Sequence, residues 1–272
     1  MEFEPDFIQD LPSHVLAEEP ILRAENISIR FGSNPVLRNI DFSVFKGETV
    51  AIIGESGCGK TVLLKTLIGL NKPNEGRILF DNNDLNKLSY FDLARTRTRY
   101  GFVFQQAALF DSMTIRENIA FSLVQHTNKS KKEINEVVVR LVNEVGLSEQ
   151  VLDKKPAELS GGMRKRVGFA RALALEPELI LYDEPTTGLD PIMSDVIDEL
   201  MIETHTRYNV TSIMVTHDMK SACKVADRII MLYPITKLTE SESQMIFDGT
   251  AEKLNASNDQ RVQQFLGKKK II

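Results

Sequence analysis

The sequence contains only two cysteines, Cys58 and Cys223, and no apolar stretch long enough to cross a bilayer. Two cysteines without metal-ligand spacing predict reduced thiols and neither a disulfide framework nor a zinc site. The longest apolar runs, such as residues 229–233, are far shorter than the roughly 20 residues that a membrane-spanning helix needs. These absences argue against a disulfide-stabilised secreted domain and against an integral membrane protein.

Lysine and arginine are missing from residues 1–20, which hold six acidic residues. This composition lacks the basic start and apolar stretch of a signal peptide, so we expect the protein to stay in the cytosol. The net charge of −5 argues against nucleic acid as the main partner. With 272 residues, the chain can bury one large α/β core with a small lobe inserted or appended.

A glycine-rich segment at residues 54–61 reads Gly-Glu-Ser-Gly-Cys-Gly-Lys-Thr. It follows an apolar, β-branched stretch at 48–53, which predicts a buried strand, and precedes a helical stretch at 62–70. A strand, a glycine-rich turn and a helix beginning on Lys-Thr form the phosphate-binding P-loop. The glycines allow backbone N–H groups to turn toward a polyphosphate where a Cβ would block the approach. The segment therefore predicts binding of a nucleoside triphosphate.

Two side chains of this loop have predicted roles of their own. Lys60 adds a full positive charge to the helix N-terminus, and the Thr61 hydroxyl can hold Mg²⁺. Cys58 is expected to act as a small spacer and not as a redox sensor. The loop residues predicted to contact the nucleotide are Gly54, Glu55, Ser56, Gly57, Cys58, Gly59, Lys60, Thr61 and Val62.

Strand and helix patterns alternate along most of the chain. β-Forming residues at 21–31 and 36–45 flank a Gly-Ser-Asn-Pro turn and predict a hairpin. Further strands are expected at 76–80, 99–104, 179–182, 210–215 and 227–233. Helices are expected within 114–146 (where Thr114 and Glu117 form a capping box), after residue 162, and from about residues 191 and 218. This alternation predicts a parallel sheet, which a helical lobe at about 106–162 interrupts.

Three predicted strands deliver polar side chains to the end of the sheet where ligands bind. Asp183 is positioned to contact Mg²⁺ through water, and Glu184 to polarise the attacking water as a general base. His217 follows the strand at 210–215 and can donate to a γ-phosphate oxygen. Gln105 ends the strand at 99–104, where it can touch Mg²⁺ and the attacking water.

A second anion-binding turn begins at Ser160, in Leu-Ser-Gly-Gly-Met-Arg-Lys-Arg over residues 159–166. A serine and two glycines, Gly161 and Gly162, at a helix start expose backbone N–H groups to an anion. One chain has no evident need for two phosphate-binding turns around one nucleotide. Two chains arranged head to tail would use both, because the serine turn of each would cap the γ-phosphate in the other's P-loop. We therefore expect a homodimer that binds two ATP and Mg²⁺.

In this order, the motifs over residues 21–233 resemble those of the ATP-binding subunits of ABC transporters. The resemblance implies an α/β P-loop NTPase fold with a RecA-like core, an antiparallel β subdomain and an inserted α-helical subdomain. It implies that Phe31 stacks on adenine and that Asp190 belongs to a loop crossing the dimer interface. It also implies that the surface at 105–121 receives a coupling helix from a transmembrane permease.

One position departs from the commonest family pattern, because Met163 stands where most members have Gln. We expect hydrolysis to survive, because the serine hydroxyl and glycine amides carry the phosphate contacts. Together with the segments at 107–114 and 259–266, Met163 makes the chain similar to the ATPases of Mce/Mla-type lipid transport systems. That similarity implies a permease, an Mce-domain lipid-binding protein and a small regulatory subunit as partners, at the cytoplasmic face of the inner membrane.

The expected domain limits are an acidic N-terminal extension at 1–20, an ATPase domain at 21–250 and a C-terminal helical tail at 251–272. A solvated tail is the favoured interpretation of the lysines at 268–270, and contact with anionic lipid headgroups is the alternative.

Three alternative functions stay open at the level of sequence. The catalytic residues also suit the ATPase of a polar amino-acid or metal-complex importer. A soluble ABC ATPase acting on DNA or ribosomes shares them too, but such proteins usually carry a long coiled coil or two fused ATPase units. A simple P-loop kinase does not account for the serine turn.

Overall fold

The computed structural model describes residues 19–240 and 242–267. The chain divides into two compact units: one holds the described residues up to Leu93 and those from Thr211 onward, and the other is Ala94–Val210. Residues 1–18 of the predicted acidic extension and the lysines at 268–270 lie outside the described residues. None of the helices in the described part of the chain combines the length and apolar character that crossing a bilayer requires.

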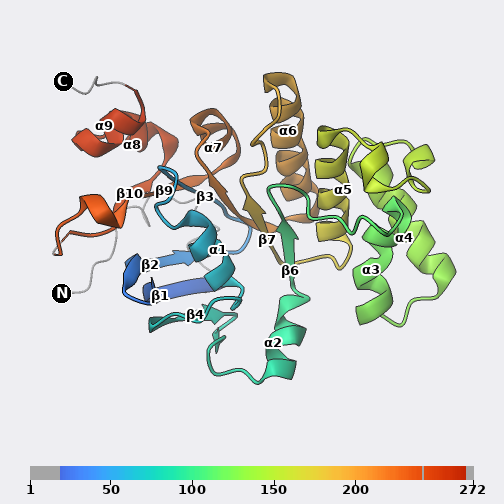
Figure 1. The fold of residues 1–272 in the computed structure, drawn as a ribbon, viewed down its shortest axis with the longest axis horizontal. Coiled ribbons are helices and arrows are strands. Elements are labelled where there is room, and N and C mark those ends of the chain that lie inside the picture. Colours follow the sequence, from blue (N-terminus) through green and yellow to red (C-terminus); the bar gives the residue numbers. More distant parts are fainter. Residues whose placement is uncertain (1–18, 241, 268–272) are drawn as a thin grey trace. The chain divides into compact units, whose positions relative to one another are not determined.

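The first unit contains an antiparallel sheet in the order β2-β1-β4-β5. Its strands are β1 (Leu22–Phe31), β2 (Asn34–Val44), β4 (Glu75–Phe80) and β5 (Asn83–Asp84). The predicted hairpin is confirmed, because β1 pairs with β2 in antiparallel register from Leu22↔Val44 to Phe31↔Asn34. Figure 1 shows β1, β2 and β4 as neighbouring blue and cyan strands.

Parallel strands form the centre of the same unit. β3 (Thr49–Gly54) pairs in parallel with β8 (Thr211–Thr216) and with β9 (Arg228–Leu232). Every residue of these three strands is buried, as expected for parallel strands covered on both faces. β10 (Met245–Gly249) pairs with β9 in antiparallel fashion; this strand was not predicted, because its side chains are mostly half-buried and lack a clear apolar run.

The helices of this unit are short. They are α1 (Lys60–Leu67), α7 (Met219–Val225), α8 (Ala251–Ala256), α9 (Gln260–Phe265) and a 3₁₀ turn at Ile235–Lys237. The boundary between the units falls within α2 (Tyr90–Arg97), a helix with no buried residue. Sequence reasoning missed α2, because a helix without an apolar face has no helical periodicity to detect.

A buried arginine ties several strands of this unit together. Arg228 on β9 is 1% exposed, and its guanidinium donates to both carboxylate oxygens of Asp248 at 2.6 and 2.9 Å. It also donates to Glu48 at 3.1 Å and to the Ser43 carbonyl at 3.0 Å. Since a buried charge is tolerated only when it is paired, this network holds β9, β10 and the end of β2 in one arrangement.

The second unit combines two parallel strands with four helices. They are β6 (Tyr100–Val103), β7 (Leu179–Asp183), α3 (Ile115–His126), α4 (Lys131–Glu144), α5 (Gly161–Leu173) and α6 (Pro191–Tyr208), with 3₁₀ turns at Glu149–Val151 and Pro156–Glu158. Helices α3, α4 and α5 pack against one another (Figure 1). The predicted capping box is confirmed: the Thr114 side chain accepts from the Glu117 N–H, and the Thr114 N–H donates to Glu117 at 2.7 Å.

Candidate functional site

The P-loop connects β3 to α1, and two of its glycines are fixed by the surrounding backbone. A Cβ on Gly54, whose φ is +150°, would lie 2.3 Å from the Leu232 carbonyl oxygen. A Cβ on Gly59, whose φ is +98°, would lie 2.7 Å from the Leu37 Cδ2 atom. A larger residue at Gly54 would have to displace the β9 backbone, and one at Gly59 would press on the Leu37 side chain and lie 3.0 Å from the Val36 carbonyl oxygen, so the tight path of the loop depends on glycine.

The middle of the loop fits a polyphosphate. Gly57 has a φ of +83°, which glycine adopts readily, and a Cβ there would meet no protein atom within 4 Å. The Lys60 ammonium is curled back over the loop, donating to the carbonyls of Gly54 at 2.8 Å and Glu55 at 3.2 Å. A cation placed over a turn of backbone amides is the arrangement that holds phosphate oxygens.

Cys58 lies inside this loop and is 1% exposed. Burial is the largest influence on its thiol and raises the pKa above the ordinary value, although Lys60 acts in the opposite direction. The thiol therefore stays protonated at neutral pH, which disfavours redox chemistry and agrees with the predicted spacer role.

Sequence reasoning missed a glutamine that supports the loop from the far end of the chain. Gln244 is 0% exposed. Its Nε2 donates to the carbonyls of Cys58 at 3.0 Å and Val36 at 3.2 Å, and its Oε1 accepts from the Arg38 N–H at 2.9 Å. Its partners precede it by 186, 208 and 206 residues, so no local pattern reveals the contact.

His217 lies at the same strand edge as the P-loop. It follows β8 directly, and in the parallel register the last residue of β8, Thr216, pairs with Ile53, the residue before Gly54. The His217 side chain is exposed. The register thus places residue 217 at the strand edge from which the P-loop leaves β3.

Phe31, the predicted adenine-stacking residue, is the last residue of β1 and is 54% exposed. A large aromatic side chain with this exposure is accessible to a ligand. This placement suits the proposed stacking role.

In the second unit, the parallel strands β6 and β7 place Gln105, Asp183 and Glu184 at one edge of the sheet. Val103 pairs with Tyr182 in parallel register, so Asp183 and Glu184 leave β7 beside the point where the chain leaves β6 toward Gln105. The strand β6 ends at Val103, one residue earlier than expected, and Gln105 lies exposed in the turn that follows. Asp183 is 7% exposed.

Glu184 has an unusual backbone for its residue type. Its φ is +49°, in the left-handed region that non-glycine residues seldom adopt. Its carboxylate accepts from the Thr187 hydroxyl at 3.0 Å, and its carbonyl accepts from the Thr187 N–H at 3.2 Å. These two bonds fix both the backbone and the carboxylate of the proposed general base.

The serine turn caps α5. The Ser160 Oγ accepts from the Met163 N–H at 3.3 Å, which leaves the hydroxyl proton available for donation. Ser160 and Gly161 are exposed, and a Cβ on Gly161 would meet nothing within 4 Å. Gly162 is buried, and a Cβ there would lie 2.6 Å from the Met193 Cε on α6.

Asp190, the predicted interface residue, is exposed and caps α6. Its carboxylate accepts from the Met193 N–H at 3.0 Å. A capping carboxylate fixes the helix start and the loop leading into it, so the loop after β7 is held at both ends.

Hydrogen bonds hold the backbone of the segment that follows Gln105. Ala107 and Ala108 both have positive φ, +60° and +47°, and their carbonyls each accept from Arg171 at 2.7 Å. Beyond them, the exposed rings of Phe110 and Phe121 lie 4.9 Å apart. The result is an ordered, partly apolar surface on the second unit.

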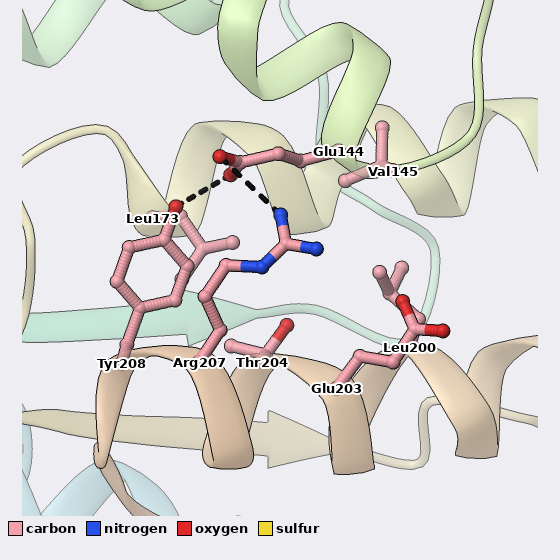
Figure 2. A pocket seen from close by; sticks show the side chains of 8 residues that line it. All are labelled: Glu144, Val145, Leu173, Leu200, Glu203, Thr204, Arg207 and Tyr208. Carbon is pink, nitrogen blue, oxygen red and sulfur yellow. Dashed lines mark hydrogen bonds and ion pairs between the residues drawn. The ribbon is translucent and has the colours of Figure 1, made fainter.

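A cavity elsewhere in this unit is too small for a nucleotide. Figure 2 shows it between the ends of α4 and α6, where Glu144 accepts from Tyr208 and forms an ion pair with Arg207. Its volume is about 10 Å³, the space of one water molecule. Burial, together with the hydrogen bond to Glu144, raises the pKa of Tyr208 to about 12.

Across the described residues, no group of three or more His, Cys, Asp and Glu side chains is arranged to hold a metal ion. Magnesium in triphosphate sites is usually bound by one or two carboxylates together with the phosphates and water. The predicted set of Thr61, Gln105 and Asp183 is of that kind.

A family model described as "ABC transporter" matches residues 37–187. The chain is 38% identical to the intermembrane phospholipid transport system ATP-binding protein MlaF of Haemophilus influenzae, covering 90% of each protein. It is 38% identical to the probable ribonucleotide transport ATP-binding protein mkl of Mycobacterium leprae, over 92% of this chain and 70% of that protein. It is 36% identical to the L-cystine import ATP-binding protein TcyC of Bacillus subtilis, over 91% of this chain and 98% of that protein.

The fold matches a solved ATP-binding cassette, MJ0796, described as a dimer in a post-hydrolysis state bound to ADP and Pi. The TM-score is 0.75 at 31% identity, covering 84% of this chain and 98% of that one. The predicted fold class is thereby confirmed: a mixed α/β cassette with an antiparallel β subdomain and a parallel core sheet.

Proposed function

The chain belongs to the ABC transporter family as an ATP-hydrolysing subunit, and from this membership we propose that it energises lipid transport through a partner permease. The cargo is phospholipid or a related lipid, moved across or between membranes. The protein acts as a peripheral subunit at the cytoplasmic face of the inner membrane, with an Mce-domain lipid-binding protein and a small regulatory subunit in the same complex.

The permease part of the proposal rests on the surface after Gln105, and the lipid part rests on the similarity to MlaF. The backbone path of that surface, with two alanines at positive φ held by Arg171, presents Phe110 and Phe121 to solvent. An exposed apolar surface of this kind favours docking of a hydrophobic helix from a membrane subunit. The segment at 107–114 is also one of those that resemble the Mce/Mla ATPases, and MlaF of Haemophilus influenzae aligns over 90% of both chains.

A second candidate is the ATPase of a polar-solute importer. The similarity to TcyC, at 36% identity over 98% of that protein, favours it, because the catalytic groups do not depend on the cargo. The similarity to mkl, whose name refers to ribonucleotide transport, likewise leaves a polar cargo as an alternative.

For hydrolysis, we propose a division of labour among the residues of the site. The P-loop amides and Lys60 bind the phosphates, and Phe31 stacks on the adenine. Thr61 and Gln105 would hold Mg²⁺, with Asp183 contacting it through water, and the ion would supply positive charge beside the phosphates.

The remaining groups act on the attacking water and on the second chain. Glu184 accepts the proton of the water, and His217 donates to the γ-phosphate. Ser160 and its glycines cap the triphosphate of a second copy of the chain, and Asp190 lies in the loop that crosses to that copy. Closure of the dimer is favoured by ATP over ADP, because only ATP offers the γ-phosphate contacts.

The catalytic part is tested by Glu184→Gln. The amide keeps the shape of the side chain but cannot take a proton, so turnover should fall at least about tenfold. ATP-dependent dimers of the variant should accumulate in size-exclusion chromatography. Unchanged turnover would remove Glu184 from this role.

The lipid part is tested by isolating the chain with its partners from native membranes. We expect a permease and an Mce-domain protein to co-purify, together with bound phospholipid detectable by mass spectrometry. The ATPase activity of the complex should respond to phospholipid vesicles and not to cystine. Recovery of an amino-acid permease with a cystine response would establish the importer function in its place.

A further inference from the structure

Lys165 is a buried lysine in the middle of α5, and it is 7% exposed. Its ammonium donates to the carbonyl of Pro185 at 2.6 Å and to the carbonyl of Thr187 at 2.6 Å. Removing an ammonium group from water is unfavourable unless its charge is compensated. Two short charge-assisted bonds provide that compensation, so the burial of Lys165 is tied to the position of these two carbonyls.

The two carbonyls belong to the loop that carries the proposed general base. Thr187 also holds Glu184, through a bond from its hydroxyl at 3.0 Å and one from its N–H at 3.2 Å. The Leu189 N–H then donates to the Thr186 carbonyl at 3.2 Å, just before Asp190 begins α6. The Lys165 ammonium therefore binds the backbone of the loop between Glu184 and Asp190.

The same helix carries the serine turn. Ser160 caps α5, and five residues later Lys165 reaches the loop after β7. The packing of Gly162 against Met193 on α6 closes the arrangement from the other side. The first part of α5, from Ser160 to Lys165, thus connects the serine turn to the loop after β7.

We propose that Lys165 is a positioning residue for ATP hydrolysis. Its ammonium fixes the backbone from Pro185 to Thr187, and so it holds the Glu184 carboxylate and Asp190 in register with the Ser160 turn. The inference rests on the role proposed above for Glu184, and Lys165 acts through that residue without touching the nucleotide.

The protonation state of Lys165 can be tested through the pH dependence of kcat. Burial lowers the pKa of its ammonium to about 8, while Glu184, on the gripped loop, acts in the opposite direction. Its neighbours on α5, Arg164 and Arg166, donate to other backbone carbonyls. A lysine with a lowered folded pKa loses its proton as the pH rises through that value, and the grip on the two carbonyls weakens with it.

The experiment compares Lys165→Met, which removes the charge but keeps the length, with Lys165→Arg, which keeps the charge. Lys131→Met, on the exposed surface of α4, is the matched control. We expect Lys165→Met to lower kcat at least about tenfold while the Kd of a fluorescent ATP analogue changes less than about twofold. Lys165→Arg should recover most of kcat, and Lys131→Met should match the wild type in both.

The wild-type protein gives a further test that needs no variant. Its kcat should fall as the pH rises through about 8, and the fall should be absent in Lys165→Arg, since arginine stays charged. The proposal is overturned if Lys165→Met retains kcat within about twofold. It is also overturned if Lys165→Met and Lys165→Arg lower kcat and Tm together while the wild-type kcat does not change with pH. Glu184→Gln, measured in parallel, separates a failed role for Glu184 from a failed role for Lys165.

Discussion

Gln244→Met should destabilise the first unit and weaken ATP binding at the same time. Methionine is close to glutamine in volume and length, so it fills the same buried space without leaving a cavity. What it removes is the amide, and with it the bonds to Arg38, Val36 and Cys58. The substitution therefore isolates the hydrogen bonds from the packing.

The magnitude follows from the burial of these bonds. A typical intramolecular hydrogen bond contributes about 1 kcal/mol to folding, and an abandoned buried partner adds a desolvation penalty. The bond to Cys58 is fully buried and the other two are partly buried. We expect the free energy of unfolding to fall by about 2 to 3 kcal/mol in total.

The consequence for ATP follows from the position of Cys58 within the P-loop. Its carbonyl is held by Gln244 at 3.0 Å, so losing the amide lets the loop take other conformations. Binding must then reorder the loop, and ATP affinity should fall by about three- to tenfold for about 1 kcal/mol of ordering.

Urea denaturation and isothermal titration with ATP measure the two effects. The control is Gln150→Met, because Gln150 is exposed on the second unit and should change stability by less than about 0.5 kcal/mol. If Gln244→Met were as stable as Gln150→Met and bound ATP as tightly as the wild type, the supporting role of Gln244 would be refuted.

Three further predictions concern the buried arginine, the P-loop and a capping box. Arg228→Met should lower the free energy of unfolding by about 3 to 5 kcal/mol in urea denaturation, because Glu48 and Asp248 lose their buried partner; a loss under about 1 kcal/mol would contradict this. Gly59→Ala should reduce ATP affinity at least about tenfold in a filter-binding assay, because φ of +98° and the contact with Leu37 exclude a Cβ; wild-type affinity would show that the loop adapts. Hydrogen bonds from Ser130 hold the pKa of Glu133 below its ordinary value. The capping box therefore stabilises the helix fully at pH values above that ordinary pKa, and this stabilisation is lost as the pH falls through the lowered pKa. Ser130→Ala should return the pKa of Glu133 toward its ordinary value in an NMR titration, and an unchanged pKa would argue against the bond.

The parts of the site that sequence predicted are those encoded within a few residues. Gly54, Gly57 and Gly59 all have positive φ, and Gly54 and Gly59 also have close neighbours; a short sequence pattern records that need directly. The Thr114–Glu117 capping box is local in the same way. The placement of His217 and Glu184 followed from one further rule, that residues after parallel strands meet at one edge, and the register Ile53↔Thr216 bears out that rule for His217.

The parts that sequence did not predict depend on contacts between distant residues. Gln244 supports a loop 186 residues earlier, and Lys165 grips a loop 20 and 22 residues later. In the sequence, Lys165 is one basic residue in a basic run, and nothing local distinguishes it from its half-buried neighbours Arg164 and Arg166. Its burial becomes visible only when the fold places α5 against the loop after β7.

Met163, which stands where most family members have Gln, shows that the side chain at this position is not needed for the geometry of the serine turn. The contribution of residue 163 to the serine turn is its backbone N–H, which donates to the Ser160 Oγ at 3.3 Å. A backbone amide is the same in methionine and glutamine, so the turn keeps its geometry with either residue. The proposed phosphate contacts therefore depend on Ser160, Gly161 and Gly162 and do not depend on the side chain at 163. A side chain free in this way can differ between transport systems, so Met163 bears on the proposed cargo, while the proposed phosphate contacts come from other atoms.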